Sequence, residues 1–338
     1  MNQKNEKKTQ HYVPKFYLRN FTDKKNCIST YIYSKDKFIK NASFDSVANE
    51  EYFYGKDLVI EKALSVMEGE WAKSFEIIIK NNEQDYSNKE VAKIIDDIYT
   101  FIGFQLSRTL KIYDSQIDLK NFLTNYITAK SSSIEAANSS LKKYFPDNFN
   151  PMLVPMQIAF FVKNLFRDLT PIILYNKTNI DFITSDNPVI LYNRFLANKN
   201  YKGNYGLGAK GLCLLLPLSP DILLCLYDHK IYFPTDNHNY YEPTTENVLE
   251  INKLICRNAY DSIFLTPNHD ENYAKQLKNS FVNNLEWRTS TAESNIGEII
   301  VVKGQSILEE YSMPFLTIKK ASKKVVVPEF GPAPRRNN

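Results

Sequence analysis

Glycine, cysteine and histidine are scarce in this sequence of 338 residues, which contains ten, four and four of them. The cysteines are far apart, with no C-x-x-C pair and no closely spaced histidines beside them, so the sequence indicates neither a zinc site nor a disulfide framework. P-loop and Rossmann glycine patterns are missing, as are the G-x-S-x-G and H-E-x-x-H motifs. These absences exclude the nucleotide-binding and hydrolase classes that such motifs define.

Long hydrophobic runs and a strong charge of one sign are missing too. No stretch reaches about 18 uninterrupted apolar residues, and the first ten residues are rich in Lys and Asn, so we expect no membrane span and no signal peptide. The net charge of +4 is the difference between 42 basic and 38 acidic residues, too little by itself to indicate a nucleic-acid-binding protein. With cysteines that read as buried free thiols, these features predict a cytoplasmic protein.

The order of patterns along the chain predicts an α+β fold. Helical spacing of apolar residues predicts helices over residues 59–80, 87–113, 115–143, 150–169, 245–258 and 269–285, the third broken near the serines at 131–133. Short apolar runs predict a hairpin over residues 27–39, a mostly antiparallel sheet over 171–227, and brief strands at 262–265, 299–302 and 315–318. We therefore expect N-terminal helices packed on a mostly antiparallel central sheet, with further helices at the C-terminal end.

The same reading predicts one elaborated domain over residues 11–320. Its helical part covers about residues 57–170, its sheet part about 171–265, and its closing helices and strands 266–320. A polar, flexible segment (1–10) precedes the domain, and a basic, proline-rich tail (321–338) that we expect to be disordered follows it.

Polar side chains interrupt the buried face of the helix predicted over residues 87–113. The apolar stripe through Phe101 continues at helical spacing onto Gln105 and Arg108. An unpaired buried guanidinium costs several kcal/mol, so we expect either an acidic partner for Arg108 or an opening into a cleft. Glu61 and Glu68, seven residues apart on one side of the preceding helix, are candidate partners and could also bind a divalent cation. The alternatives are a structural salt bridge at Arg108 and solvated glutamates.

Asp186 and Asn187 stand where an apolar strand stops at the turn Ser-Asp-Asn-Pro. A strand end is a rigid place from which a carboxylate and an amide can enter a pocket, but turn chemistry explains the same residues. His11 lies among aromatic residues in a segment that also contains Arg19, and histidine is the usual general base near neutral pH. The alternative for His11 is a hydrogen-bonded core histidine.

Four of the ten glycines fall in the loop formed by residues 203–211, between two predicted strands. Such a loop is a candidate for a phosphate cradle or a lid. Glycine-rich phosphate loops normally lead into a helix N-terminus, however, and this loop leads into a strand.

Five segments carry a distinctive mixture of polar and aromatic residues in a fixed order. They are residues 10–21 (QHYVPKFYLRNF), 60–68 (IEKALSVME), 105–109 (QLSRT), 183–188 (ITSDNP) and 216–220 (LPLSP). Together they closely resemble the bacterial family called domain of unknown function 4238, over roughly residues 9–266, with Leu110 where the family pattern would have proline. The resemblance implies no activity. It does imply that the candidate residues, all inside these segments, could converge into one site.

Two main hypotheses of function remain. In the first, the protein is a metal-dependent hydrolase of phosphodiesters or nucleotides, of a nuclease-effector kind, with a nucleotide or nucleic acid as its partner. Its catalytic residues would be His11, Arg108 and Asp186; Arg19, Gln105 and Asn187 would bind substrate; Glu61 and Glu68, together with Asp186, would hold a divalent cation such as Mg²⁺ or Mn²⁺. In the second, the protein is a non-catalytic binding or interaction module whose polar residues form a buried network. A metal-free nucleotide-binding transferase, with Asn187 and an aromatic wall around a base, is a third alternative.

Overall fold

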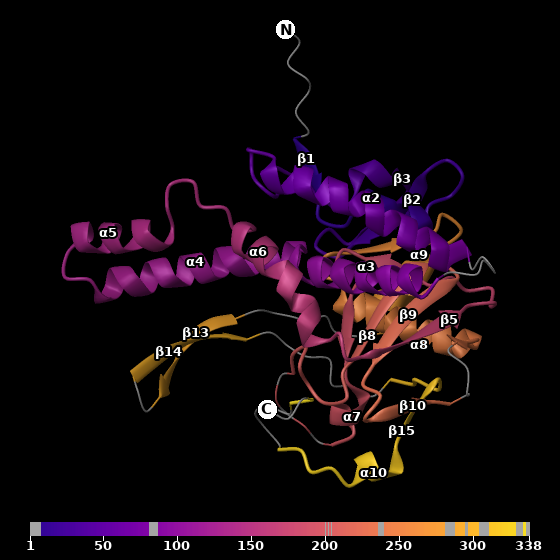
Figure 1. Cartoon of the computed structure of the whole chain (residues 1–338). Coiled ribbons are helices and arrows are strands. Elements are labelled where there is room, and N and C mark those ends of the chain that lie inside the picture. Colours follow the sequence, from indigo (N-terminus) through magenta and orange to yellow (C-terminus); the bar gives the residue numbers. More distant parts are fainter. Residues whose placement is uncertain are drawn as a thin grey trace.

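The computed structural model describes residues 8–80, 87–199, 201, 203, 205–235, 240–280, 288–294, 297–303, 311–328 and 334–335. Two sheets lie at its centre, with helices packed around them (Figure 1). The larger has the order β11 (Tyr240–Tyr241), β5 (Thr170–Tyr175), β9 (Ile222–Tyr227), β8 (Cys213–Ser219), β7 (Ile190–Tyr192); the smaller has the order β3 (Lys37–Ser43), β2 (Cys27–Ile32), β12 (Ser262–Leu265), β6 (Thr184–Ser185). All these pairings are antiparallel except that of β11 with β5. The predicted α+β class is confirmed.

The five-stranded sheet is buried on both faces, which explains why its strands are continuous apolar runs. Every residue of β8 and β9 is buried. Because successive side chains of a strand point to opposite faces, Leu214 and Leu216 join one hydrophobic cluster, whereas Cys213 and Leu215 join another. The first cluster includes the apolar faces of α2 (Val59–Lys80), α3 (Asn88–Ser107) and α6 (Leu153–Val162); the second includes α8 (Thr245–Asn258) and the four-stranded sheet.

Helix α3 begins at the predicted capping box of Ser87 and Glu90, but it does not continue to residue 113. A new helix, α4 (Leu110–Lys130), starts directly after Thr109, whose hydroxyl accepts a hydrogen bond from the N–H of Ile112 at 3.3 Å. A side-chain cap of this kind stabilises a helix start by roughly 1 kcal/mol, enough to compete with continuation of the previous helix. The break places Arg108 in the link between two helices.

The predicted helix over residues 115–143 is interrupted at the serine triplet, as expected, where Ser133 caps α5 (Ile134–Tyr144). Helices α4 and α5 form an arm that projects from the core (Figure 1). The shorter helices are α1 (Lys15–Leu18), α7 (Arg194–Ala197), α9 (Glu271–Asn279) and α10 (Lys320–Lys323), and the 3-10 turns are η1 (Arg19–Phe21), η2 (Phe44–Ser46) and η3 (Lys163–Leu165). The remaining strands are β1 (Thr9–His11), β4 (Asn49–Glu51), β10 (Tyr232–Pro234), β13 (Arg288–Ser294), β14 (Gly297–Lys303) and β15 (Leu316–Ile318).

The described parts of both terminal segments are held against the core, whereas the sequence predicts a flexible start and a disordered tail. Strand β1 pairs with β4, and Gln10 is completely buried. At the other end, α10 reaches Lys323, and Arg335 is 4% exposed. The difference arises because the partners of these residues, such as Asp168 for Arg335, lie far away in the sequence.

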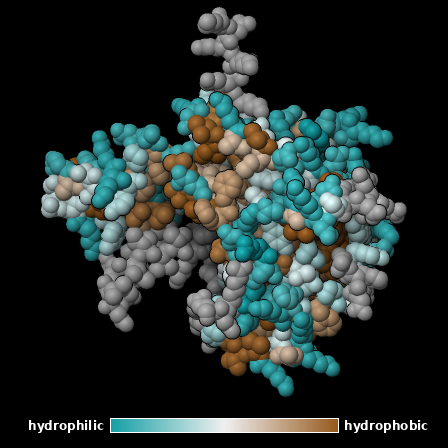
Figure 2. Space-filling model, viewed as in Figure 1, coloured by the Kyte–Doolittle hydropathy of each residue, from teal (hydrophilic) through white to brown (hydrophobic). Residues whose placement is uncertain are grey.

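Helix α6 carries an exposed apolar face. At least half of the surface of Val154, Ile158, Phe160 and Phe161 is exposed, while Ala159 faces the core. In Figure 2 brown and tan atoms gather over the start of α6 and the adjoining part of α4. Within the described part of the chain, no helix is both long and apolar enough to cross a membrane.

Candidate functional site

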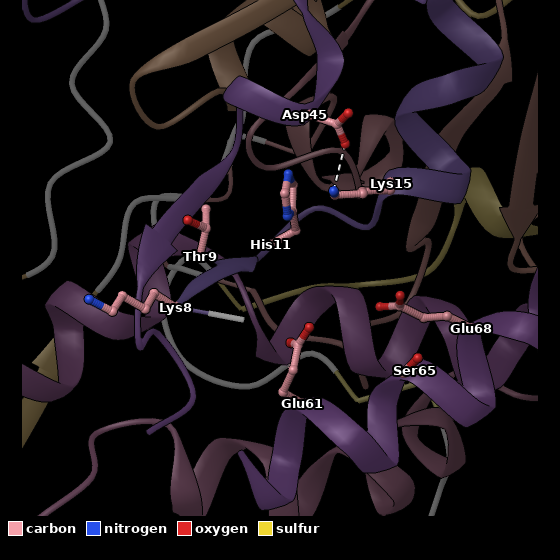
Figure 3. A pocket seen from close by; sticks show the side chains of 8 residues that line it. All are labelled: Lys8, Thr9, His11, Lys15, Asp45, Glu61, Ser65 and Glu68. Atoms are coloured by element: carbon pink, nitrogen blue, oxygen red, sulfur yellow. Dashed lines mark ion pairs between the residues drawn. The ribbon is translucent and has the colours of Figure 1, made fainter. Parts of the chain in front are cut away.

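A polar pocket of about 390 Å³ lies between strand β1 and helix α2 (Figure 3). Its lining residues are Lys8, Thr9, His11, Lys15, Asp45, Glu61, Ser65 and Glu68. In Figure 3 the carboxylates of Glu61 and Glu68 project from α2 on one side of the pocket, while the His11 ring extends from β1 on the other side, toward Asp45 and Lys15. Three of the residues proposed from the sequence therefore share one pocket, although they come from two elements about fifty residues apart.

Helical geometry places the acidic side chains of α2 together. Glu61, Ser65 and Glu68 are separated by four and then three residues, so they share one face of the helix. Leu64 and Trp71, three or four residues from these positions, border this face and are buried in the core. Burial of this apolar stripe fixes the rotation of α2 about its axis, and the acidic face is left looking toward β1.

Arg108 lies directly behind Glu68 and is completely buried. Its Nη1 donates to Glu68 Oε1 at 2.6 Å, and its Nε donates to Gln105 Oε1 at 2.9 Å. The rings of Trp71 and Phe101 each lie 5.9 Å from the guanidinium carbon and cover the Arg108 end of the ion pair, whereas Glu68 is partly exposed to the pocket. The prediction that an acidic residue of the first helix pairs with Arg108 is thus confirmed for Glu68.

Nη2 of Arg108, which carries two N–H groups, is buried and has no hydrogen-bond partner within the described residues. Tyr54 is nearby: burial raises the pKa of its hydroxyl, and the charge of Arg108 opposes that rise. The Tyr54 hydroxyl donates to the carbonyl of His11 at 3.1 Å. A buried donor without a partner costs about 1–3 kcal/mol, so an acceptor that reached Nη2 would be stabilised there.

Gln105 holds the backbone beside His11. Its Nε2 donates to the carbonyl of Tyr12 at 3.1 Å, while its oxygen accepts from Arg108. Gln10 fixes the same segment from the other side, since its amide oxygen accepts from the N–H of Tyr54 at 2.5 Å. Gln105 is fully buried and lies behind the pocket wall, so the structure gives it the position of a support for His11 and Arg108.

Charges surround the mouth of the pocket. Lys15 Nζ lies 2.5 Å from Asp45 Oδ1 (dashed in Figure 3). This hydrogen bond lowers the pKa of Asp45, and the charges of Lys15, His11 and Arg19 lower it further. Arg19 itself is exposed outside the pocket lining, with its guanidinium 5.5 Å from the centre of the Phe44 ring.

Asp186 is held in a different place, at the start of β12. It is 1% exposed, and its carboxylate accepts hydrogen bonds from the N–H groups of Tyr260, Asp261 and Ser262 at 2.8, 2.6 and 2.8 Å. Burial raises the pKa of Asp186 to about 6, and the three backbone donors oppose that rise. The carboxylate is saturated by backbone groups and does not line the pocket.

Asn187 is bound in the same way. Its Nδ2 donates to the carbonyl of Asn258 at 2.9 Å, and Nδ2 of Asn258 donates back to the carbonyl of Asn187 at 2.6 Å. This reciprocal pair joins the turn after β6 to the C-terminal end of α8. The turn interpretation of Asp186 and Asn187 therefore describes their observed bonds better than the pocket interpretation does.

Ionisable residues gather around Asp186 as a second group. Burial lowers the pKa of the half-buried Lys111 to about 8, and the negative charge of Asp186 opposes this. Burial raises the pKa of Tyr12, and Asp186 makes the largest charge contribution to that rise. The Tyr260 hydroxyl donates to Asp114 Oδ2 at 2.7 Å. Tyr12 thus lies between the pocket and the group around Asp186, because its carbonyl accepts a hydrogen bond from Gln105 behind the pocket.

Sequence reasoning missed Lys15, Asp45 and Ser65 as lining residues. Ser65 could have been found, because it lies on the same helical face as Glu61 and Glu68. No sequence signal marks Lys15 or Asp45, since their ion pair depends on the contact between α1 and η2.

The donor set for a metal ion is smaller than the sequence suggested. Among the residues that the structure describes, no group of three or more His, Cys, Asp or Glu side chains is arranged to hold a metal ion. Asp186, the expected third ligand beside Glu61 and Glu68, is occupied by backbone amides instead.

Comparison with known proteins gives the family but no activity. No curated protein and no solved structure matches this chain. A family model described as "Protein of unknown function (DUF4238)" matches residues 9–269, a span that contains the pocket residues from Thr9 to Glu68, Arg108 and the turn at Asp186. Because this match covers most of the chain, the protein belongs to that family.

Proposed function

We propose that the pocket between β1 and α2 is the active site of a hydrolase that acts on nucleotides or other phosphodiesters. The observation that carries this proposal is the convergence of His11, Glu61 and Glu68 in one open pocket, with the buried Arg108 behind it. General acid–base catalysis needs a side chain such as histidine within reach of the reacting atoms and a geometry fixed by its neighbours.

Each residue has a role that its contacts support. His11 would activate water or protonate the leaving oxygen, since it lines the pocket. Lys8 and Lys15 would attract the phosphate charge at the mouth. Arg108 would act as a positioning residue, because its Nη1 holds Glu68 at 2.6 Å. Arg19, close enough to lower the pKa of Asp45, would contact the part of the substrate that lies outside the pocket.

A divalent cation fits this proposal as a companion of the substrate. Mg²⁺ is commonly held by one or two carboxylates together with substrate phosphates, which matches a pocket that offers Glu61 and Glu68. When bound, the ion would neutralise phosphate charge. Asp186 and Asn187 would contribute indirectly, by fixing the turn next to Tyr12. The cysteines at positions 27, 213, 225 and 256 are all free thiols, which favours a cytoplasmic setting.

A non-catalytic module is the second candidate. The observation that favours it is the set of hydrogen bonds through which Gln105, Arg108 and Glu68 join α2, α3 and the N-terminal segment. Under this reading the same residues fix the packing of the helices and bind no substrate.

The test compares activity with stability in the same variants. Purified full-length protein is assayed for phosphate release from nucleotides and for cleavage of bis(p-nitrophenyl) phosphate, with Mg²⁺ or Mn²⁺, and melting temperatures are recorded with each ligand. We expect His11→Gln and Glu61→Gln to lose at least 100-fold in rate while melting close to the wild type. Glu76→Gln, an exposed glutamate on the same helix, is the matched control.

Two results would decide against the hydrolase. If wild type shows no turnover and no ligand-dependent rise in melting temperature, the pocket is not a phosphate-ester site. If instead His11→Gln and Glu61→Gln lose activity only in proportion to a lower melting temperature, the residues support the fold, and the non-catalytic module is the better description.

A further inference from the structure

The glycine-rich loop of residues 203–211 and the C-terminal segment meet around one side chain, Arg335, which is almost completely buried. All five N–H groups of its guanidinium find acceptors. Nε and Nη2 donate to the two carboxylate oxygens of Asp168 at 2.9 and 3.0 Å. Nη1 donates to the carbonyls of Leu207 and Ala209 at 3.1 and 3.0 Å. Nη2 also donates to the carbonyl of Leu165 at 2.5 Å. The arrangement combines a bidentate ion pair with a ring of carbonyl oxygens.

This geometry gives the glycine-rich loop a chemistry opposite to that of a phosphate cradle. Phosphate cradles present backbone N–H groups, whereas here the loop presents carbonyl oxygens, which attract a cation. The end of the loop is rigid: Gly211 has φ +76°, its N–H donates to Asp228 Oδ2 at 2.9 Å, and its carbonyl accepts from the Tyr232 hydroxyl at 2.9 Å. A Cβ at residue 211 would lie 2.6 Å from Phe195 Cβ, so only glycine fits.

Arg335 fixes the described end of the tail. Arg335 adds one backbone bond, from its N–H to the carbonyl of Gly208 at 2.7 Å, and Pro334 bridges Ala209. Before that point Val326 is 92% exposed, whereas Val325 and Val327 are partly buried against the second hydrophobic cluster. A segment of partly exposed residues opens at a lower free energy than the packed core.

Space for a larger ligand adjoins the anchor. Asp168 and Arg335 border a pocket of about 690 Å³, whose wall also includes Lys210, Asp228 and His229. An arginine side chain seated on Asp168 could therefore continue into a longer peptide without displacing the sheet.

We propose that Asp168 and the carbonyls of Leu165, Leu207 and Ala209 form an arginine-recognition site, and that the C-terminal segment is its exchangeable internal ligand. An arginine-bearing segment of another protein competes with Arg335 for the site. Planar, five-donor geometry is what distinguishes arginine from lysine at such a site. The internal ligand has an effective concentration on the order of millimolar, so it keeps weak external ligands out. The site is independent of the proposed hydrolase, because none of its residues lines the pocket beside α2.

The experiment vacates the site in the full-length chain. Arg335→Ala is compared with wild type for binding of a fluorescent peptide copied from residues 329–338 (EFGPAPRRNN) and for the shift in melting temperature with millimolar methylguanidinium. We expect Arg335→Ala to melt at a lower temperature, to recover part of the difference with methylguanidinium, and to bind the peptide at least tenfold more tightly than wild type does. Methylammonium, which has the positive charge but not the planar set of N–H donors, should not restore the melting temperature.

Three controls make the result specific. Arg336→Ala removes the same charge one position away and should behave as wild type. A peptide with alanine in place of the first arginine should not bind, and adding Asp168→Asn to Arg335→Ala should abolish both recovery and binding. If Arg335→Ala fails to fold, Arg335→Lys replaces it, because lysine keeps the charge but cannot satisfy five acceptors.

The proposal is overturned if the vacated protein shows neither recovery by methylguanidinium nor peptide binding, or if both peptides bind equally well. It is also overturned if Arg335→Ala and wild type have the same melting temperature and the same peptide affinity, since the tail would then not occupy the site in solution.

Discussion

In the pocket beside α2, charged side chains border a cavity, whereas at the turn after β6 the same kinds of side chain are enclosed by backbone. His11, Glu61 and Glu68 line a cavity. Asp186 and Asn187 instead bond to backbone groups of Asn258 through Ser262. The comparison teaches that a dense polar motif is informative about function only after its acceptors and donors have been counted. Groups that border a cavity are candidates for ligands, and groups enclosed by backbone hold the fold.

The largest effect is expected where the pocket meets the core. Arg108→Ala should lower the free energy of unfolding by about 3–5 kcal/mol, because it removes a fully buried ion-pair partner and leaves Glu68 and Gln105 unsatisfied. Denaturant titration measures this, with the exposed Arg19→Ala as control, for which we expect a change below about 0.5 kcal/mol. A loss under 1 kcal/mol for Arg108→Ala would mean that the ion pair is not formed in solution.

Asp186→Ala tests the saturated region. It leaves three partly buried backbone N–H groups without an acceptor, so we expect a loss of about 3 kcal/mol in the free energy of unfolding. Asp23 is the matched control, because its exposed carboxylate accepts from the N–H groups of Lys25 and Cys27, and Asp23→Ala should cost about 1 kcal/mol or less. Equal losses in the two variants would show that the burial of Asp186 does not increase the contribution of its hydrogen bonds to the free energy of unfolding.

The titration of Asp186 should be visible in the pH dependence of stability. Burial raises its pKa from an ordinary 3.8 to about 6. A raised folded-state pKa contributes stability that is present below the unfolded pKa and is lost as the pH rises through the folded value. The free energy of unfolding of wild type relative to Asp186→Asn should therefore fall by about 2–3 kcal/mol between about pH 4 and pH 6.5. A difference that is flat, or that rises with pH, would contradict the raised pKa.

The smallest effect on stability is expected at the pocket lining. Glu61→Gln should change the free energy of unfolding by no more than about 0.5 kcal/mol, because the half-buried carboxylate faces the pocket space. The same denaturant titration measures it, beside Glu76→Gln. Destabilisation above about 2 kcal/mol would mean that Glu61 stabilises the fold, as Asp186 does, and would contradict its assignment to the pocket lining.

Local patterns predicted much of the secondary structure, and their failures have identifiable causes. The capping box at Ser87 and the apolar stripe of α2 are signals within a few residues, and both were read correctly. The end of α3 was not, because the cap at Thr109 competes with a stripe that continues through it. The strands of residues 171–227 were expected in one sheet, but β6 pairs with β12, which follows it by some eighty residues.

Of the residues that line the pocket, the sequence analysis named His11, Glu61 and Glu68, and it predicted that Arg108 needs an acidic partner. Helical spacing and the cost of burying an unpaired charge are properties of short segments, so they can be calculated without a structure. That Asp186 and Asn187 share one site with His11 was expected from the family resemblance alone. The observed hydrogen bonds instead join both residues to backbone groups outside the pocket lining.

By itself, then, the sequence determined the α+β class, the acidic face of α2 and the buried charge of Arg108, because each follows from residue type and local period. Only the tertiary structure decided that Lys15 and Asp45 close the pocket, that Asp186 is saturated by the backbone of residues 260–262, and that Arg335 crosses the molecule to Asp168. These contacts join segments up to 167 residues apart, and their geometry depends on how two buried faces of one sheet position the rest of the chain.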